Sequence, residues 1–157
     1  MILTILQTIV FITYITFLVK KFGVLPSISE SWYRLQPEKL GYLFTLFCLT
    51  LGILMLYQGT QDTSLFFISG VGLCFVGAAT QFKINDYYTG IIHSAGAAIC
   101  IVSALVGIGI EYNLWLPGFG FIILTIPAYI FIKKNKTWWI EMLAFISILI
   151  GLIIINF

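Results

Sequence analysis

The sequence predicts an all-α membrane protein, a polytopic transmembrane bundle of six helical spans, and three observations lead to this fold class. Of the 157 residues, 61% are hydrophobic and only 9% are charged, whereas soluble domains carry about 25% charged residues. The apolar residues form runs close to the ~20 residues that an α-helix needs to cross a bilayer. These runs are continuous and lack the alternation of transmembrane β-strands.

Six stretches qualify as spans, and polar breaks separate them. Most of these breaks are too short to hold a domain, so we expect one domain over residues 1–157. Trp and Tyr favour the headgroup level of a bilayer, and Trp115, Trp138 and Trp139 fall at span edges. The predicted spans cover residues 2–19, 40–57, 64–82, 87–110, 115–132 and 138–157.

The basic residues predict how the bundle is oriented. With six crossings the first, third and fifth loops share one side, and all eight basic residues fall in these loops. The positive-inside rule makes that side the cytoplasm, so both termini are expected outside. The basic residues are Lys20, Lys21, Arg34, Lys39, Lys83, Lys133, Lys134 and Lys136.

The long first loop has the pattern of a short amphipathic helix over about residues 27–36. Ser27 and Glu30 form the S-x-x-E pattern of a capping box. Ile28, Trp32 and Leu35 recur at the spacing of one helix face. We therefore expect a helix that lies on the inner headgroup layer with its apolar face down. The alternative is a loop that only spaces two spans.

Small residues distinguish the third and fourth spans from the others. Gly90, Ser94 and Ala98 repeat every four residues, and Gly96 belongs to a further stripe that we interpret as neighbouring. Because small residues let helix backbones approach closely in lipid, these two spans are expected to form the tightly packed centre. In the fifth span, Pro127 predicts a kink.

Polar side chains gather in the inner half of the predicted spans, where ionisable groups are costly and often functional. The pattern predicts a pocket or vestibule that opens to the cytoplasm, with His93 as its floor and the loop helix as its roof. The structural alternative is that His93 only hydrogen-bonds to Glu141, Tyr14 or a backbone carbonyl. The candidate pocket residues are His93, Asp86, Glu141, Tyr14, Tyr129, Gln81, Ser29 and Ser31.

The cysteines and the basic residues exclude other site classes. Cys48, Cys74 and Cys100 lie in mid-span and form no CxxC or Cys/His pattern, so neither a metal site nor a cofactor is expected. Eight Lys and Arg cannot form a phosphate-binding face when most of the chain lies in lipid, so nucleic acid is excluded as a partner.

Several strings carry a resemblance to known groups of membrane proteins: the loop from Gly23 to Leu35, the segments 43–48 and 76–79, and Ile92-His-Ser-Ala-Gly-Ala97. The chain resembles uncharacterised small bacterial and phage membrane proteins, which implies the cytoplasmic membrane of a bacterium. More remotely, it is similar to the ceramidase-like CREST superfamily of membrane hydrolases. Asp86, His93 and a serine in 27–31 match residue types of that superfamily's site. The superfamily uses three metal-binding histidines, whereas this chain has one histidine in total.

Three functions follow as hypotheses. The leading one is non-enzymatic: a bundle that binds a lipid, a small molecule or a membrane partner through its inner pocket, alone or as a homo-oligomer. The first alternative is a CREST-like hydrolase acting on a lipid, with His93 near Ser29 or Ser31. The second alternative is a small transporter or channel subunit, which the one-sided polarity disfavours because transport needs polar groups through the full thickness.

Overall fold

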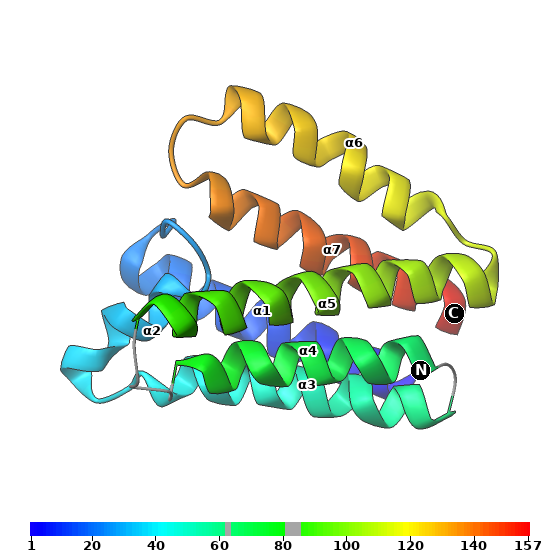
Figure 1. The fold of residues 1–157 in the computed structure, drawn as a ribbon, viewed down its shortest axis with the longest axis horizontal. Coiled ribbons are helices and arrows are strands. Elements are labelled where there is room, and N and C mark those ends of the chain that lie inside the picture. The colour runs from blue at the N-terminus through cyan, green and yellow to red at the C-terminus, as the bar shows by residue number, and fades with distance from the viewer. Residues whose placement is uncertain (62–63, 81–85) are drawn as a thin grey trace.

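The computed structural model describes residues 1–61, 64–80 and 86–157, and this part of the chain is helical without strands (Figure 1). Among the described residues, the longest run without helix is 23–29, which follows the first helix. In chain order the helices are α1 (Ile2–Phe22), α2 (Glu30–Leu35), the 3₁₀ helix η1 (Gln36–Glu38), α3 (Tyr42–Gln61), α4 (Ser64–Ala79), α5 (Asp86–Tyr112), α6 (Leu116–Phe131) and α7 (Lys136–Asn156).

A long helix occupies each stretch predicted as a span, with shifted ends. α1 continues through Lys20 and Lys21, whose positive charges interact favourably with the negative, C-terminal end of the helix dipole. α3 continues to Gln61. Among the described residues, α1, α3, α5 and α7 are long and apolar enough to cross a membrane. α4 and α6 have 16 residues each, or about 24 Å of helix against a hydrocarbon core of about 30 Å.

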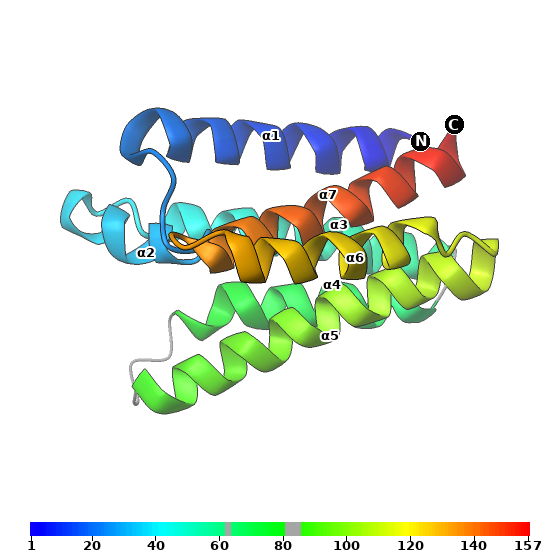
Figure 2. The same cartoon turned by 90° about the horizontal axis from the view of Figure 1, so that it is seen from above.

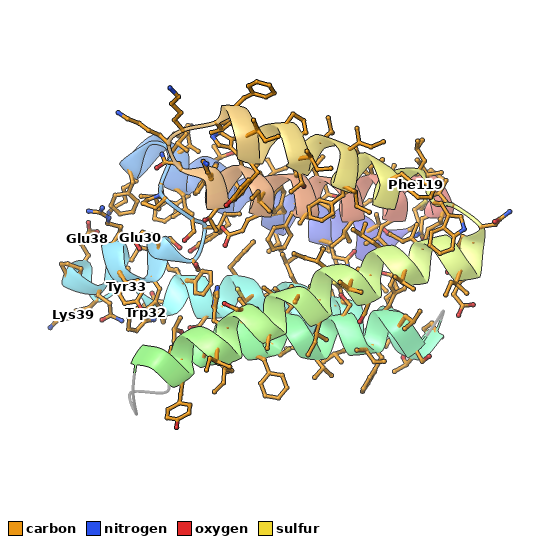
Figure 3. The ribbon with its side chains drawn as sticks, turned by 45° about the horizontal axis from the view of Figure 1, so that its top comes forward. Glu30, Trp32, Tyr33, Glu38, Lys39 and Phe119 are labelled. Carbon is orange, nitrogen blue, oxygen red and sulfur yellow. The ribbon has the colours of Figure 1, made fainter. Side chains whose placement is uncertain are left out.

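The six long helices alternate in direction along the chain, so both termini lie at one end of the bundle (Figure 1). There the amino group of Met1 donates to Asn156 Oδ1 at 2.7 Å. At the opposite end, the side chain of Lys21 pairs with Glu38, and Figure 3 shows Glu38 and Lys39 at this end. We call the two ends the terminal end and the loop end.

Five of the long helices form a ring of neighbours, and the sixth lies outside it. α3 packs between α1 and α4, α4 between α3 and α5, and α7 closes the ring by packing on both α5 and α1 (Figures 1 and 2). α6 packs mainly on α7, and most of its large apolar side chains are exposed. In lipid such exposure carries no cost, because the surrounding acyl chains are as apolar as the helix.

Glycines set the close approach of α4 and α5. A Cβ atom added at Gly72 or at Gly96 would lie 2.7 Å from the carbonyl oxygen of the other glycine. Gly90, Ser94 and Ala98 are exposed, so the prediction that they pack was wrong. Residues two positions apart point about 200° apart on a helix, so the two stripes lie on nearly opposite faces and one neighbour contacts only one of them.

The predicted loop helix is present but shorter than 27–36, and its apolar face packs on the bundle. The Glu30 N–H donates to Ser27 Oγ at 3.0 Å, but the N-cap of α2 is Ser29 and not Ser27, so the expected capping box does not begin this helix. Ile28 and Leu35 are buried in the same core as Leu18 and Phe44. The apolar face of this helix is therefore covered by the protein core and not by the headgroup layer. The core lies next to the loop and already excludes water.

Candidate functional site

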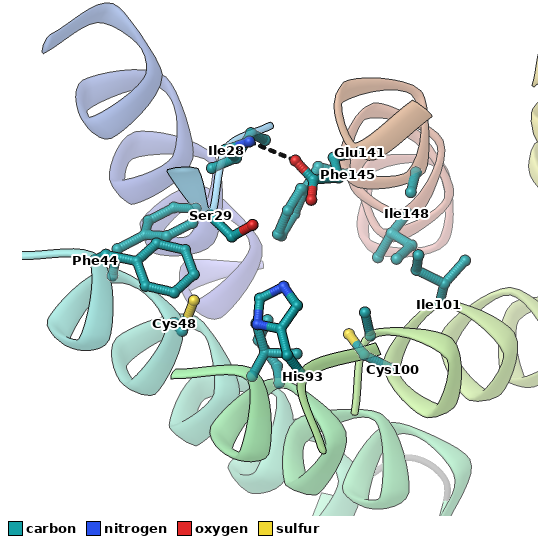
Figure 4. Close-up of a pocket in the computed structure, with 15 residues that line it drawn as sticks. Ile28, Ser29, Phe44, Cys48, His93, Cys100, Ile101, Glu141, Phe145 and Ile148 are labelled. Atoms are coloured by element: carbon teal, nitrogen blue, oxygen red, sulfur yellow. Dashed lines mark hydrogen bonds between the residues drawn. The ribbon is translucent and has the colours of Figure 1, made fainter. Parts of the chain in front are cut away.

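A pocket lies within the ring of helices, toward the loop end (Figure 4). α3, α4, α5 and α7 each contribute side chains to its wall, and residues 28 and 29 of the long connection close it from the loop end. The space amounts to about 510 Å³ counted out to its open mouth, and about 60 Å³ of it admits the centre of a water-sized sphere. The pocket is therefore narrow.

Most of the pocket wall is aliphatic or aromatic, and three polar side chains from three different elements enter it. They are His93 from α5, Glu141 from α7 and Ser29 from the connection before α2. Figure 4 shows them converging on one end of the space, with Cys48 and Cys100 flanking His93. The structure thus brings together three of the eight residues predicted from the sequence.

The connection is held over the pocket by hydrogen bonds to the start of α7. The Asn135 side chain donates to the Val24 carbonyl at 2.8 Å, and the Trp138 N–H donates to the Pro26 carbonyl at 3.0 Å. The Ile28 N–H donates to Glu141 Oε2. Trp138 N–H belongs to the first turn of α7, where helix N–H groups lack intrahelical partners, so the connection satisfies the helix end while it roofs the pocket.

His93 lies beside Val76 of α4 in the pocket wall, and its ring centroid lies 6.3 Å from that of Phe44. Figure 4 shows the ring directed into the pocket below Ser29 and Glu141. Of the structural partners considered for His93, a backbone group, that of Val76, is the one that its electrostatics indicate.

Tyr14 and Ser31 form a separate contact between α1 and α2. Ser31 Oγ donates to the Ile28 carbonyl at 2.6 Å, so Tyr14 Oη donates to Ser31 Oγ at 2.7 Å. The Tyr14 ring stacks on Phe47 with a centroid distance of 4.2 Å, and Phe47 itself lines the pocket. These two predicted residues support the roof from behind and do not line the pocket.

Three predicted pocket residues remain. One lies away from the pocket, and the side chains of the other two are outside the described part of the structure. Tyr129 is 60% exposed on α6, with Lys136 Nζ 4.6 Å from its ring centroid. It is not part of the pocket, because α6 lies outside the ring. Gln81 lies outside the described residues, and Asp86 begins α5 with a side chain that is also outside the described part.

Two glutamines pair near the terminal end, and this pairing was not predicted. Gln7 on α1 and Gln58 on α3 are each 2% exposed, and Gln7 Nε2 donates to Gln58 Oε1 at 3.4 Å. One turn from Gln7, Thr4 is buried as well. The prediction of one-sided polarity was therefore wrong, because α3 extends past Tyr57 and carries Gln58 into the core. Gln7 stands in an otherwise apolar stretch of sequence and Gln58 directly follows one, and this pattern could have indicated that the two amides bond to each other.

No family model, curated protein or solved structure matches the chain. Across the residues that the structure describes, no three His, Cys, Asp or Glu side chains are grouped as a metal ion requires. The geometry alone thus indicates what the site can do. An apolar slot with polar groups at one end is the form of a small-ligand site, in which apolar walls bind and a few polar groups orient.

Proposed function

We propose that this chain is a membrane-embedded binding protein that holds a lipid or other small ligand in the pocket within its ring of helices. One observation carries the proposal: His93, Glu141 and Ser29 come from three separate elements and meet at one end of an apolar cavity. Ionisable groups are costly within a membrane. A cavity next to two of them gives a ligand both an apolar wall and hydrogen-bonding partners.

The proposed arrangement in the membrane is six crossings with both termini outside, in the cytoplasmic membrane of a bacterium. Its support is the alternation of the six long helices, the shared end of the two termini and the basic residues of the loop end (Figure 1). α4 and α6 cross by thinning the bilayer locally or by using their flanking residues, which costs a fraction of a kcal/mol per Å.

Labelling with a membrane-impermeant maleimide in intact cells tests this arrangement. Gln61 and Lys134 are both exposed; Gln61 ends α3, whereas Lys134 lies in the connection between α6 and α7, and Figure 1 shows these two segments at opposite ends of the bundle. We expect Gln61→Cys to be labelled from outside and Lys134→Cys to be labelled only after the cells are opened. Labelling of both positions from the same side would contradict the six crossings.

The binding proposal is tested by what the protein retains through purification. Wild type, His93→Ala and Tyr129→Ala are purified under identical conditions and compared by native mass spectrometry. We expect wild type and Tyr129→Ala to carry the same added mass, because Tyr129 lies outside the ring, and His93→Ala to lose it. An identical spectrum for all three, or no retained mass in wild type, would contradict the proposal.

A lipid hydrolase is the second candidate, because Ser29 and His93 line the same pocket. Ser29 Oγ is within 3.0 Å of Ser27 Oγ, so the serine would have to turn toward His93 before His93 could act as its base. Turnover of a neutral lipid ester by wild type, lost in Ser29→Ala and in His93→Ala, would favour this candidate over binding alone.

A further inference from the structure

The pocket lies in the angle between two helices that meet at the terminal end and separate at the loop end. At the meeting point, Ile108 of α5 packs on Gly151 of α7, where an added Cβ would lie 2.6 Å from Ile108 Cδ1. Toward the loop end the two helices draw apart in Figure 1. There His93 and Ala97 face Glu141 and Ala144 across the pocket.

The separated half of α5 is largely free of protein cover. Ile91, Ser94 and Ala98 are exposed, whereas Ala104 and Ile108 in the other half are buried. In a bilayer this exposed half contacts acyl chains of the leaflet at the loop end. Because residues 28 and 29 close the pocket at the loop end, a ligand from this leaflet would pass beside the exposed half of α5.

The dimensions of the pocket limit the ligand to one slender chain. The pocket holds about 510 Å³ counted out to its open mouth. If each methylene takes roughly the ~30 Å³ that one water takes in the liquid, about 17 methylenes fill this space, which is one long alkyl chain and not two. Phe44, Phe47 and Phe145 belong to the wall, and Ile148 lies at its far end.

The polar end of the pocket selects the head group. Glu141 uses Oε2 to accept the Ile28 N–H, and Figure 4 shows its other oxygen directed toward the space above His93. A carboxylate oxygen accepts hydrogen bonds, while Ser29 and an imidazole can each donate or accept. A hydroxyl group matches this set, because it donates to the carboxylate and accepts from the other two without bringing a second charge into the membrane.

We infer that the pocket takes a single-chain amphiphile with a neutral hydroxyl head, of the monoacylglycerol class, which enters sideways between α5 and α7. This inference rests on the proposed binding function and narrows its ligand. The chain lies along the aromatic wall toward Ile148, and the hydroxyl group lies between Glu141 and His93.

Three neutral probes with the same acyl chain test the inference on the wild-type protein. Monooleoylglycerol has one chain and hydroxyl groups, methyl oleate has one chain and no donor, and dioleoylglycerol has two chains. Each is added to the purified protein, and bound mass is measured by native mass spectrometry. We expect one bound monooleoylglycerol, with at least tenfold weaker binding of the other two. Equal binding of methyl oleate or of dioleoylglycerol would overturn the inference.

A matched pair of substitutions on α5 locates the site. Ala97 lines the pocket and Ala98 points away from it. We expect Ala97→Trp to lower monooleoylglycerol binding at least tenfold and Ala98→Trp to leave it within twofold. Should Ala97→Trp fail to fold, the three-probe comparison in wild type still decides.

The outcome for the narrower inference is separable from the outcome for the binding function. A retained water-soluble ligand that depends on His93, together with no monooleoylglycerol binding, would overturn the inference and leave the binding function standing. The absence of any retained ligand would remove both.

Discussion

The two halves of α5 have opposite surroundings. Toward the terminal end, Ala104 and Ile108 are buried between α4 and α7; toward the loop end, Ser94 and Ala98 face outward while His93 faces a pocket. Lipid is as apolar as a protein core, so a helix in a membrane can remain uncovered without an energetic cost. The bundle can therefore be closed at one end and hollow at the other.

Buried polar groups follow the same division. At the closed end, Gln7 and Gln58 bond to each other and their helices pack around them. At the hollow end, Glu141 and Ser29 bond to the connection that roofs the pocket, and each keeps an atom directed toward the space (Figure 4). The glutamine bond links α1 to α3 at the closed end, where Gln7 Oε1 and Thr4 Oγ1 also lie buried without a hydrogen-bond partner among the described residues. At the hollow end the polar groups lie beside the cavity that we propose as a ligand site.

The largest expected effect comes from the glycine contact between α4 and α5. Gly96→Leu places a side chain against the Gly72 carbonyl, which cannot move without shifting α4, so we expect a loss of at least about 3 kcal/mol in the free energy of unfolding. Ala98→Leu, two residues along and exposed, is expected to change it by less than about 0.5 kcal/mol. Unfolding in detergent measures both, and equal losses would contradict the assignment of the packed face.

The roof of the pocket should depend on Glu141. Glu141→Ala removes the acceptor for the Ile28 N–H, and an unsatisfied buried N–H costs about 1–3 kcal/mol. We expect a loss in that range together with faster proteolysis between Gly23 and Ser29. Glu141→Gln keeps an acceptor oxygen and should lose less than half as much. Unchanged proteolysis in Glu141→Ala would show that this bond does not hold the roof.

The glutamine pair at the closed end should show a smaller effect. Gln7→Leu and Gln58→Leu each leave one buried amide without its partner, and we expect each to cost about 1 kcal/mol. The double substitution should cost less than the sum, with a coupling near the ~0.6 kcal/mol typical of such bonds in membranes. Additive losses in this double-mutant cycle would mean that the two amides do not interact.

The smallest effect is expected on α6. Tyr129→Ala removes an exposed ring outside the ring of helices, so we predict a change within about 0.5 kcal/mol in stability and no change in retained ligand. A loss of ligand in this variant, measured by native mass spectrometry, would place α6 at the pocket after all.

Hydropathy and local patterns predicted the elements because each depends on nearby residues. A segment in lipid must satisfy its own backbone hydrogen bonds, so six apolar runs indicate six helices, and the pattern of Ser27 and Glu30 indicates a short helix in the first loop. Small errors arose at ends: α3 continues to Gln61, and that extension buries Gln58. A hydropathy boundary marks a change in composition, which need not coincide with the last helical residue.

The arrangement of the site depends on contacts between distant segments, which local patterns specify poorly. Depth in a span placed Tyr129 level with His93, but depth does not tell which helix lies outside the ring. The sequence of α5 has two stripes of small residues, one with Ser94 and Ala98 and one with Gly96, and both are suited to close packing. The stripe with Gly96 is the packed one because α4 lies against it. His93 and Glu141 were found because ionisable residues in apolar spans are conspicuous individually, whereas Ser29 was one of several serines in the loop.

The central claim is that the hollow end receives a lipid chain between α5 and α7. A monoacylglycerol with a photoactivatable diazirine in mid-chain tests it in membranes, followed by mapping of the labelled residues. Labels are predicted on residues 97–101 of α5 and 144–148 of α7, and an excess of monooleoylglycerol should suppress them. Labels confined to outward-facing side chains such as Ile91, Ile122 and Ile150, and insensitive to the competitor, would contradict the claim.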